Sequence, residues 1–164
     1  MMAALGVRQI SAPIEAPDLA NGPVYTGWRE ARAMPVYVVS LNERREPVAR
    51  PLTHYPRHSP DGFGWGLTIG ETNGGPADLA YAILHDYLAQ GAGQLMSRAR
   101  WFQAIDETAE ALHQEFKGAF VVYFSPGHWH LSAASVRDWL RLMREDPETP
   151  CELRLALGYL LHKR

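Results

Sequence analysis

The chain contains one cysteine, Cys151, among its 164 residues. An intramolecular disulfide is therefore impossible, and so is a zinc site built from several thiolates. The fold must be stabilised by its hydrophobic core, and a chain of this length can bury about 70% of its unfolded surface.

The chain also lacks a surplus of positive charge, because 16 Lys and Arg stand against 18 Asp and Glu. Proteins dedicated to nucleic acids usually carry such a surplus, since neutralising phosphates supplies much of their affinity. The overall charge therefore argues against this class and leaves only a local basic patch as a possible nucleic-acid site.

A long hydrophobic run is the third feature the chain lacks. No stretch approaches the roughly 20 apolar residues that span a bilayer, and residues 1–13 have too short an apolar segment for a signal peptide. We therefore expect a cytoplasmic protein with no membrane partner.

The residues that are present are those of a globular domain, with 46% hydrophobic, 10% aromatic and 21% charged side chains. Residues 1–24 show no sustained period and contain awkwardly placed Pro and Gly, which predicts an irregular N-terminal arm. We expect an α+β domain over residues 25–146 and a C-terminal helix over residues 147–164, packed on the same domain.

Short segments rich in β-branched and aromatic residues predict extended structure. We expect a strand at 35–41, a return arm at 48–52 that Pro47 and Pro51 push to a sheet edge, and a strand at 119–124 with a short partner at 129–131. Residues 63–67 alternate large side chains with glycine, which fits an extended segment that presses Phe63 and Trp65 onto one side.

Apolar residues at helical spacing predict helices at 76–90, 102–117, 133–145 and from Thr149 onward. Pro76 suits a first helical position, Ser132 is a good N-cap, and Thr149 with Glu152 forms a capping-box pattern. On the helix at 102–117, one buried stripe is expected, made of Phe102, Ile105, Ala109, Leu112 and Phe116. The predicted fold class is α+β, with a small antiparallel or mixed β-sheet and three to four helices packed on one face.

Several short motifs carry a family resemblance. They are Tyr25-Thr-Gly-Trp-Arg29, Ser59-Pro-Asp-Gly-Phe-Gly-Trp-Gly66, Gly74-Gly-Pro-Ala-Asp-Leu-Ala80, Ile83-Leu-His-Asp-Tyr-Leu88, Leu112-His-Gln-Glu-Phe-Lys117, Trp129-His-Leu-Ser132 and Val136-Arg-Asp-Trp-Leu140. Over about residues 25–140 the chain resembles an uncharacterised family of bacteria and their phages, domain of unknown function 6166. The resemblance implies a bacterial or phage origin but no activity and no catalytic residue.

Gly74 and Gly75 precede a predicted helix, where free N–H groups and the helix dipole can hold an anion. Trp65 could add an aromatic surface for a ligand. The alternative is that these residues only form a turn and a close-packed strand, since Pro76 removes one donor and Asp78 competes for the same helix end.

Arg44, Arg45, Arg50 and Arg57 form a local basic stretch that could contact nucleic acid or an acidic partner. The alternative is a solvated surface.

His128 and His130 alternate on a predicted strand, so both imidazoles share one face and could share a metal. A third ligand would have to come from His54, His58 or His113. The alternative is a pair of exposed histidines. Cys151, near a helix start, is most simply a small structural thiol.

The sequence contains no recognised catalytic motif, and the motif residues are mostly Gly, Pro, Trp and Leu. We therefore expect a non-catalytic interaction or regulatory accessory domain without a cofactor, with a protein partner or self-association. The alternatives are a nucleic-acid-binding module using the hairpin from Arg44 to Arg57, or a binder of small anions at Gly74 and Gly75.

Overall fold

The structure is a computed structural model that describes residues 19–28, 35–53, 55, 74–90, 97–125 and 127–162. The predictions for Trp65, Arg57, His54, His58 and the extended segment at 63–67 lie outside these residues. So do residues 1–18, most of the expected N-terminal arm.

Within the described residues, four antiparallel strands form one sheet in the order β3-β2-β1-β4. They are β1 (Val24–Trp28), β2 (Val36–Leu41), β3 (Pro47–Pro51) and β4 (His128–Ser132). The 48–52 arm is confirmed as an edge strand, because β3 has β2 as its one partner among the strands that the structure describes, and it begins and ends on proline. The sequence analysis missed the central strand β1, whose five residues include Gly27 and Trp28 and show no clear alternation.

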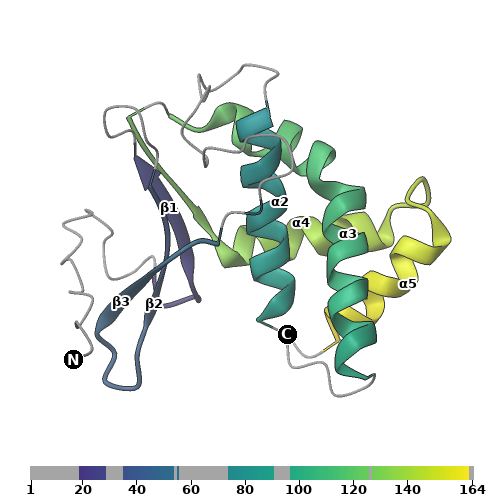
Figure 1. Cartoon of the computed structure of the whole chain (residues 1–164), viewed down its shortest axis with the longest axis horizontal. Helices are drawn as coiled ribbons and strands as arrows, with labels where there is room; N and C mark the ends of the chain where they lie inside the picture. Colours follow the sequence, from purple (N-terminus) through teal and green to yellow (C-terminus); the bar gives the residue numbers. More distant parts are fainter. Residues whose placement is uncertain are drawn as a thin grey trace.

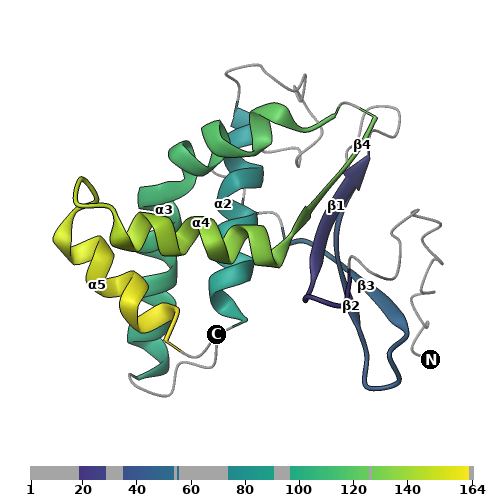
Figure 2. The ribbon, with the colours of Figure 1, turned by 180° about the vertical axis from the view of Figure 1, so that it is seen from behind.

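The helices lie on one side of this sheet, as the two opposite views of Figures 1 and 2 show. They are α2 (Gly74–Ala89), α3 (Arg98–Ala119), α4 (Ala133–Glu145) and α5 (Cys151–Leu160), with a short 3-10 helix, η1 (Val121–Tyr123), between α3 and β4. The predicted fold class, α+β with helices on one face of a small antiparallel sheet, is confirmed.

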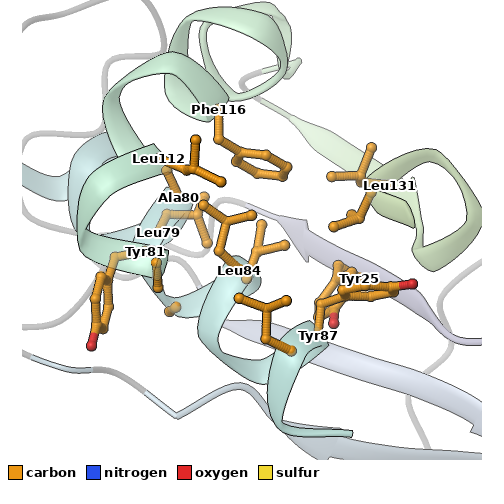
Figure 3. Packing of buried hydrophobic residues seen from close by; sticks show 14 of the residues in the cluster. Tyr25, Leu79, Ala80, Tyr81, Leu84, Tyr87, Leu112, Phe116 and Leu131 are labelled. Atoms are coloured by element: carbon orange, nitrogen blue, oxygen red, sulfur yellow. The ribbon is translucent and has the colours of Figure 1, made fainter. Parts of the chain in front are cut away.

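The core lies between the sheet and α2, the most deeply buried helix. Leu79 and Leu84 of α2 are fully buried and meet Tyr25 of β1 and Phe116 of α3 in one cluster, part of which is drawn in Figure 3. Because α2 is covered by the sheet on one side and by α3 on the other, its sequence is apolar nearly all round.

Two helices begin earlier than predicted. α2 starts at Gly74, two residues before Pro76, and α3 starts at Arg98, where the Ser97 side chain accepts a hydrogen bond from the Arg100 amide. The predicted stripe on α3 is buried except for Phe102, which is 40% exposed. Placing Phe102 in the core was wrong, because its ring lies at the surface beside Trp101 and the Arg98 guanidinium.

The strand predicted at 119–124 does not form. α3 continues to Ala119, the Phe120 amide donates to the Phe116 carbonyl (3.0 Å), and η1 follows. A short apolar run is ambiguous between strand and helix, and here Phe120 packs its ring on Phe116 and Trp139 between helices. β4, expected as the partner of that strand, pairs with β1 instead.

The sequence predicts the N-terminal start of α4 correctly but not that of α5. Ser132 caps α4 as expected, since its side chain accepts from the Ser135 amide (3.1 Å). The capping box at Thr149 is wrong, because α5 begins at Cys151 without a side-chain cap bond. The Thr149 hydroxyl is buried and has no hydrogen-bond partner in the described part of the chain.

Candidate functional site

The Gly74–Gly75 helix start is packed into the protein. Gly75 and Pro76 are buried, and Asp78, two residues further on, is completely buried. Trp65, the other half of the expected ligand site, lies outside the described residues. The geometry at Gly75 adds no support to the ligand site, which stays a prediction.

The basic stretch divides into an exposed turn and a paired arginine. Arg44 and Arg45 are exposed in the β2–β3 turn, where Asn42 Oδ1 accepts from the amides of Arg44 and Glu46, both at 2.9 Å. Arg45 takes the positive φ of 61° that closes this turn. Glu43 and Glu46 lie in the same turn and balance the two arginines.

Arg50 lies on β3 and points to the helix side, where it forms a two-pronged ion pair with Asp86 of α2. The two N···O distances are 2.8 and 2.9 Å. The hydrogen bond to Asp86 raises the pKa of the Arg50 guanidinium. Asp86 Oδ2 also accepts from the Tyr25 hydroxyl (3.0 Å) and from Gln90 (2.7 Å). These contacts bind β1, β3 and α2 together, so Arg50 has a structural role that the sequence analysis did not foresee.

A second cluster of polar side chains joins α2 to α3. His85 Nε2 lies 2.9 Å from Asp106 Oδ1, and the Tyr81 hydroxyl donates to the same oxygen at 3.2 Å. The Tyr55 ring lies against His85, with 4.7 Å between ring centroids. Burial raises the pKa of the Tyr55 hydroxyl, and the charges of Asp106 and Asp86 raise it further. A carboxylate that orients an imidazole is also found in acid–base sites, but here it holds two helices in register.

His128 and His130 share one face of β4, as predicted, with Trp129 on the other face. Their ring centroids are 6.3 Å apart. Thr26 Oγ1 donates to the Trp129 carbonyl (3.0 Å), so it must accept from His128 Nε2, 3.1 Å away. His128 is therefore protonated on Nε2 when neutral, and its Nδ1 is free to accept.

The structure does not bring a third metal ligand to this pair. Within the described ranges, no group of three or more His, Cys, Asp or Glu side chains is placed to hold a metal ion. His113 is on α3, where its Nδ1 lies 2.6 Å from the Glu110 carbonyl and its Nε2 lies 2.9 Å from Gln114 Nε2. The other two candidate third ligands, His54 and His58, lie outside the described residues.

The histidines belong to a larger surface on the side of the sheet away from the helices. Tyr25, Val38 and Leu131 face the core, so alternation turns Thr26, Tyr37 and His130 the other way. On that outer side Trp28 and Tyr37 stack with ring centroids 5.4 Å apart and an interplanar angle of 10°. Their strand register places His128 opposite Trp28 and His130 opposite Thr26.

We call Trp28, Tyr37, His128 and His130 the outer aromatic face. Trp28, Tyr37 and His128 are half-buried and His130 is exposed. A cavity of about 400 Å³ adjoins this face at His130 and is also lined by Asn21, Ser132 and Ser135. The sequence analysis found the histidine half of this surface but missed the aromatic half, because β1 was not recognised as a strand.

The remaining candidate, Cys151, is an exposed thiol on the first residue of α5. α5, coloured yellow in Figure 2, lies at the end of the helical layer away from the sheet. Of the helices in the described part of the chain, none is both long enough and apolar enough to cross a membrane.

Comparison with the curated proteins and with the solved structures finds no match. Residues 25–104 match the family described as "Family of unknown function (DUF6166)". The match ends before the motifs that begin at Leu112, so it is shorter than the resemblance over 25–140. The matched residues include β1, β2, β3 and α2 with the Arg50–Asp86 ion pair. Residues 25–104 of this chain are therefore similar to the DUF6166 family.

Proposed function

We propose that the chain is a non-catalytic interaction domain, a regulatory accessory factor that binds a protein partner through the outer aromatic face. The observation that carries the proposal is the shared position of His130, which belongs both to this face and to the wall of the 400 Å³ cavity. Aromatic side chains are enriched in protein interfaces, and Trp and Tyr are frequent among the few residues that contribute most of the binding energy.

The polar chemistry of the helix side supports binding over catalysis. The Asp86 carboxylate is occupied by Arg50, Tyr25 and Gln90, and the carboxylate of Asp106 by His85 and Tyr81. These groups already hold strands and helices together. On the outer aromatic face, the contacts among the described residues are the Trp28–Tyr37 stack between β1 and β2 and the His128–Thr26 bond.

The setting we infer is the cytoplasm of a bacterium or of a phage-infected cell, where the domain would act as an accessory to another protein. Its support is the family resemblance and the sequence, which carries one cysteine and no long apolar run.

Affinity capture from the organism that encodes the chain tests the proposal. A double variant, Tyr37→Ala with His130→Ala, should lose the captured partner at least tenfold relative to the wild type. Tyr123→Ala is the matched control, because Tyr123 is 80% exposed on η1 and should capture the partner normally. Capture that is equal for both variants would refute the role of the outer aromatic face.

A nucleic-acid-binding module is the second candidate, favoured by the exposed Arg44 and Arg45 at the end of the same sheet. The balance of these arginines by Glu43 and Glu46, and the pairing of Arg50 with Asp86, make it the weaker one. Retention on a heparin or DNA column that falls with salt, and is abolished by Arg44→Glu with Arg45→Glu, would establish it in place of the protein partner.

A further inference from the structure

The outer edge of β3 offers few backbone groups to another strand, because proline occupies most of it. The Leu52 amide donates to the Val36 carbonyl (2.9 Å), a bond that flanks Pro51 and turns the backbone of Pro51 away from β2. Every second residue of an antiparallel strand bonds a given neighbour, so Pro47, Ala49 and Pro51 all turn their backbone groups outward. Proline has no N–H, and of these three residues Ala49 alone has a donor.

The outer edge of β4 is open in the described part of the chain. The Ala133 amide donates to the Pro23 carbonyl (2.8 Å), so the residues whose backbone groups bond β1 are Leu131 and every second residue from it. The N–H and C=O groups of His128 and His130 therefore point away from β1. No described strand pairs with β4 on that side. Two residues of this edge thus present donors and acceptors for another main chain.

The open edge of β4 continues the outer aromatic face. His130 of β4, Thr26 of β1 and Tyr37 of β2 are neighbours in one row across the sheet. An added strand would lie about 5 Å beyond β4 and would extend this row next to His130. The cavity of about 400 Å³ is lined by three residues of the same strand, His130, Leu131 and Ser132. It therefore lies within reach of a side chain of the added strand.

The sequence of β4 has none of the features that usually keep other strands from an edge. His128-Trp-His-Leu-Ser132 contains no proline and no Lys, Arg, Asp or Glu, whereas prolines and charged side chains are the common protection. Its outward N–H and C=O groups recur every second residue, about 7 Å apart, and so match the main chain of another extended segment. Peptides that add a strand to a sheet edge gain affinity from such bonds and specificity from pockets for their alternate side chains.

We propose that the protein partner contributes an extended segment that adds to the open edge of β4 as a further strand. Its main chain exchanges hydrogen bonds with His128 and His130, and one of its side chains enters the cavity beside His130. This inference rests on the proposed function, because the segment belongs to the partner that covers the outer aromatic face. It makes binding depend on a backbone N–H group of this domain, which contact through side chains alone does not.

A proline substitution tests the main-chain bonds. His130→Pro removes the outward N–H of residue 130 and leaves the bonds to β1, because an edge strand tolerates proline where its N–H faces away from the neighbouring strand. His130→Ala removes the same side chain but keeps the N–H, so it is the reference. In quantitative affinity capture from the organism that encodes the chain, His130→Pro should retain at least tenfold less partner than His130→Ala. Ala49→Pro is the matched control, because it removes an outward N–H from the opposite edge and should capture the partner normally.

The outcomes of this capture separate the two proposals. Equal capture by His130→Pro and His130→Ala, with a partner still captured by the wild type, would overturn strand addition and leave the proposed function standing. A wild type that captures no partner would overturn both. Loss of the partner in Ala49→Pro as well as in His130→Pro would show that the effect is not specific to β4, and would also overturn strand addition.

Amide hydrogen exchange tests the edge without any substitution. In the free protein the His128 and His130 amides should exchange at least tenfold faster than those of Trp129 and Leu131, which bond β1. Addition of the affinity-purified partner should slow exchange at His128 and His130. Unchanged exchange in the complex, or equally slow exchange at all four amides in the free protein, would overturn the proposal. Slowing that appears when the concentration of the chain alone is raised would indicate pairing of β4 with a second copy and would also overturn it. Circular dichroism, with slow exchange at Leu131, shows whether His130→Pro is folded.

Discussion

Gly27 of β1 lies beneath the indole of Trp129, the residue opposite it on β4. A Cβ atom at position 27 would come within 2.7 Å of the Trp129 ring. Trp129 cannot move easily, because its other side is stacked on Phe124 with ring centroids 4.1 Å apart. Gly27→Ala should therefore destabilise the fold by about 1–3 kcal/mol, as overpacking usually does.

Urea unfolding measures the free energy of unfolding of Gly27→Ala, and Gly118→Ala serves as the matched control. Gly118 lies in α3 and has no atom within 4 Å of an added Cβ, so its replacement should stabilise the helix by about 0.5–1 kcal/mol. If Gly27→Ala were as stable as the wild type, the close approach of strand and indole would be contradicted.

Asp86 joins three partners at the sheet–helix junction, Tyr25, Arg50 and Gln90. Asp86→Ala removes the acceptor of the buried Tyr25 hydroxyl together with the partner of Arg50, so we expect a loss of about 2–3 kcal/mol in the free energy of unfolding. Arg50→Met should cost less, under about 1 kcal/mol, because the Arg50 side chain is 49% exposed and solvent screens its charge. Equal losses in denaturant unfolding would contradict the central role of Asp86.

Tyr55 makes the stability of the fold depend on pH in the alkaline range. Burial and the nearby charges of Asp106 and Asp86 raise the pKa of its hydroxyl in the folded state. As the pH rises, the Tyr55 hydroxyl therefore loses its proton first in the unfolded chain, near pH 10. Below that pH the neutral hydroxyl makes its full contribution to the free energy of unfolding. This contribution falls as the pH rises through the pKa of the folded state. Tyr55→Phe should lose less stability than the wild type between about pH 9 and pH 11 in urea unfolding. An identical loss would rule this contribution out.

At the scale of elements, the start of α5 differs from that of α4. Ser132 uses its hydroxyl as a cap, whereas the buried hydroxyl of Thr149 finds no partner among the described residues. Thr149→Val keeps the shape and removes the unsatisfied polar group, so it should raise the free energy of unfolding by about 1 kcal/mol. Ser132→Ala should lower it by a similar amount. A destabilised Thr149→Val protein would show that the hydroxyl has a partner after all.

The sequence predicts an element well where local signals agree with packing. α4 has its cap, its period and its length within one short window, and it forms where expected. The run at 119–124 has the β-branched and aromatic residues of a strand. It is buried instead by packing against α3 and Trp139, and a local sequence pattern cannot predict these contacts. β1 was missed for the same reason, since only its two neighbours make it a strand.

For the candidate site, too, the sequence predicts what is local and misses the contacts between distant segments. His128 and His130 share a face as their spacing predicts, because a strand has a period of two. Their meeting with Trp28 and Tyr37 depends on the pairing of β4 with β1, two strands far apart in the sequence. Thr26 and His128, for example, are separated by 102 residues. The pairing of Arg50 with Asp86 depends likewise on how α2 crosses the sheet.

At the scale of the whole molecule, the helices cover one face of the sheet and the outer aromatic face lies on the other (Figures 1 and 2). The proline-bounded strand β3 protects one edge of the sheet against pairing with other chains.

Site-specific photo-cross-linking tests the interaction proposal most directly. A photoreactive phenylalanine analogue is placed at Tyr37 in one protein and at Tyr123 in another, each expressed in the organism that encodes the chain. We predict that position 37 cross-links repeatedly to one partner protein that position 123 does not reach, and that His130→Ala weakens this cross-link. Absence of any specific protein adduct at position 37, or the same adducts from both positions, would contradict the proposed function.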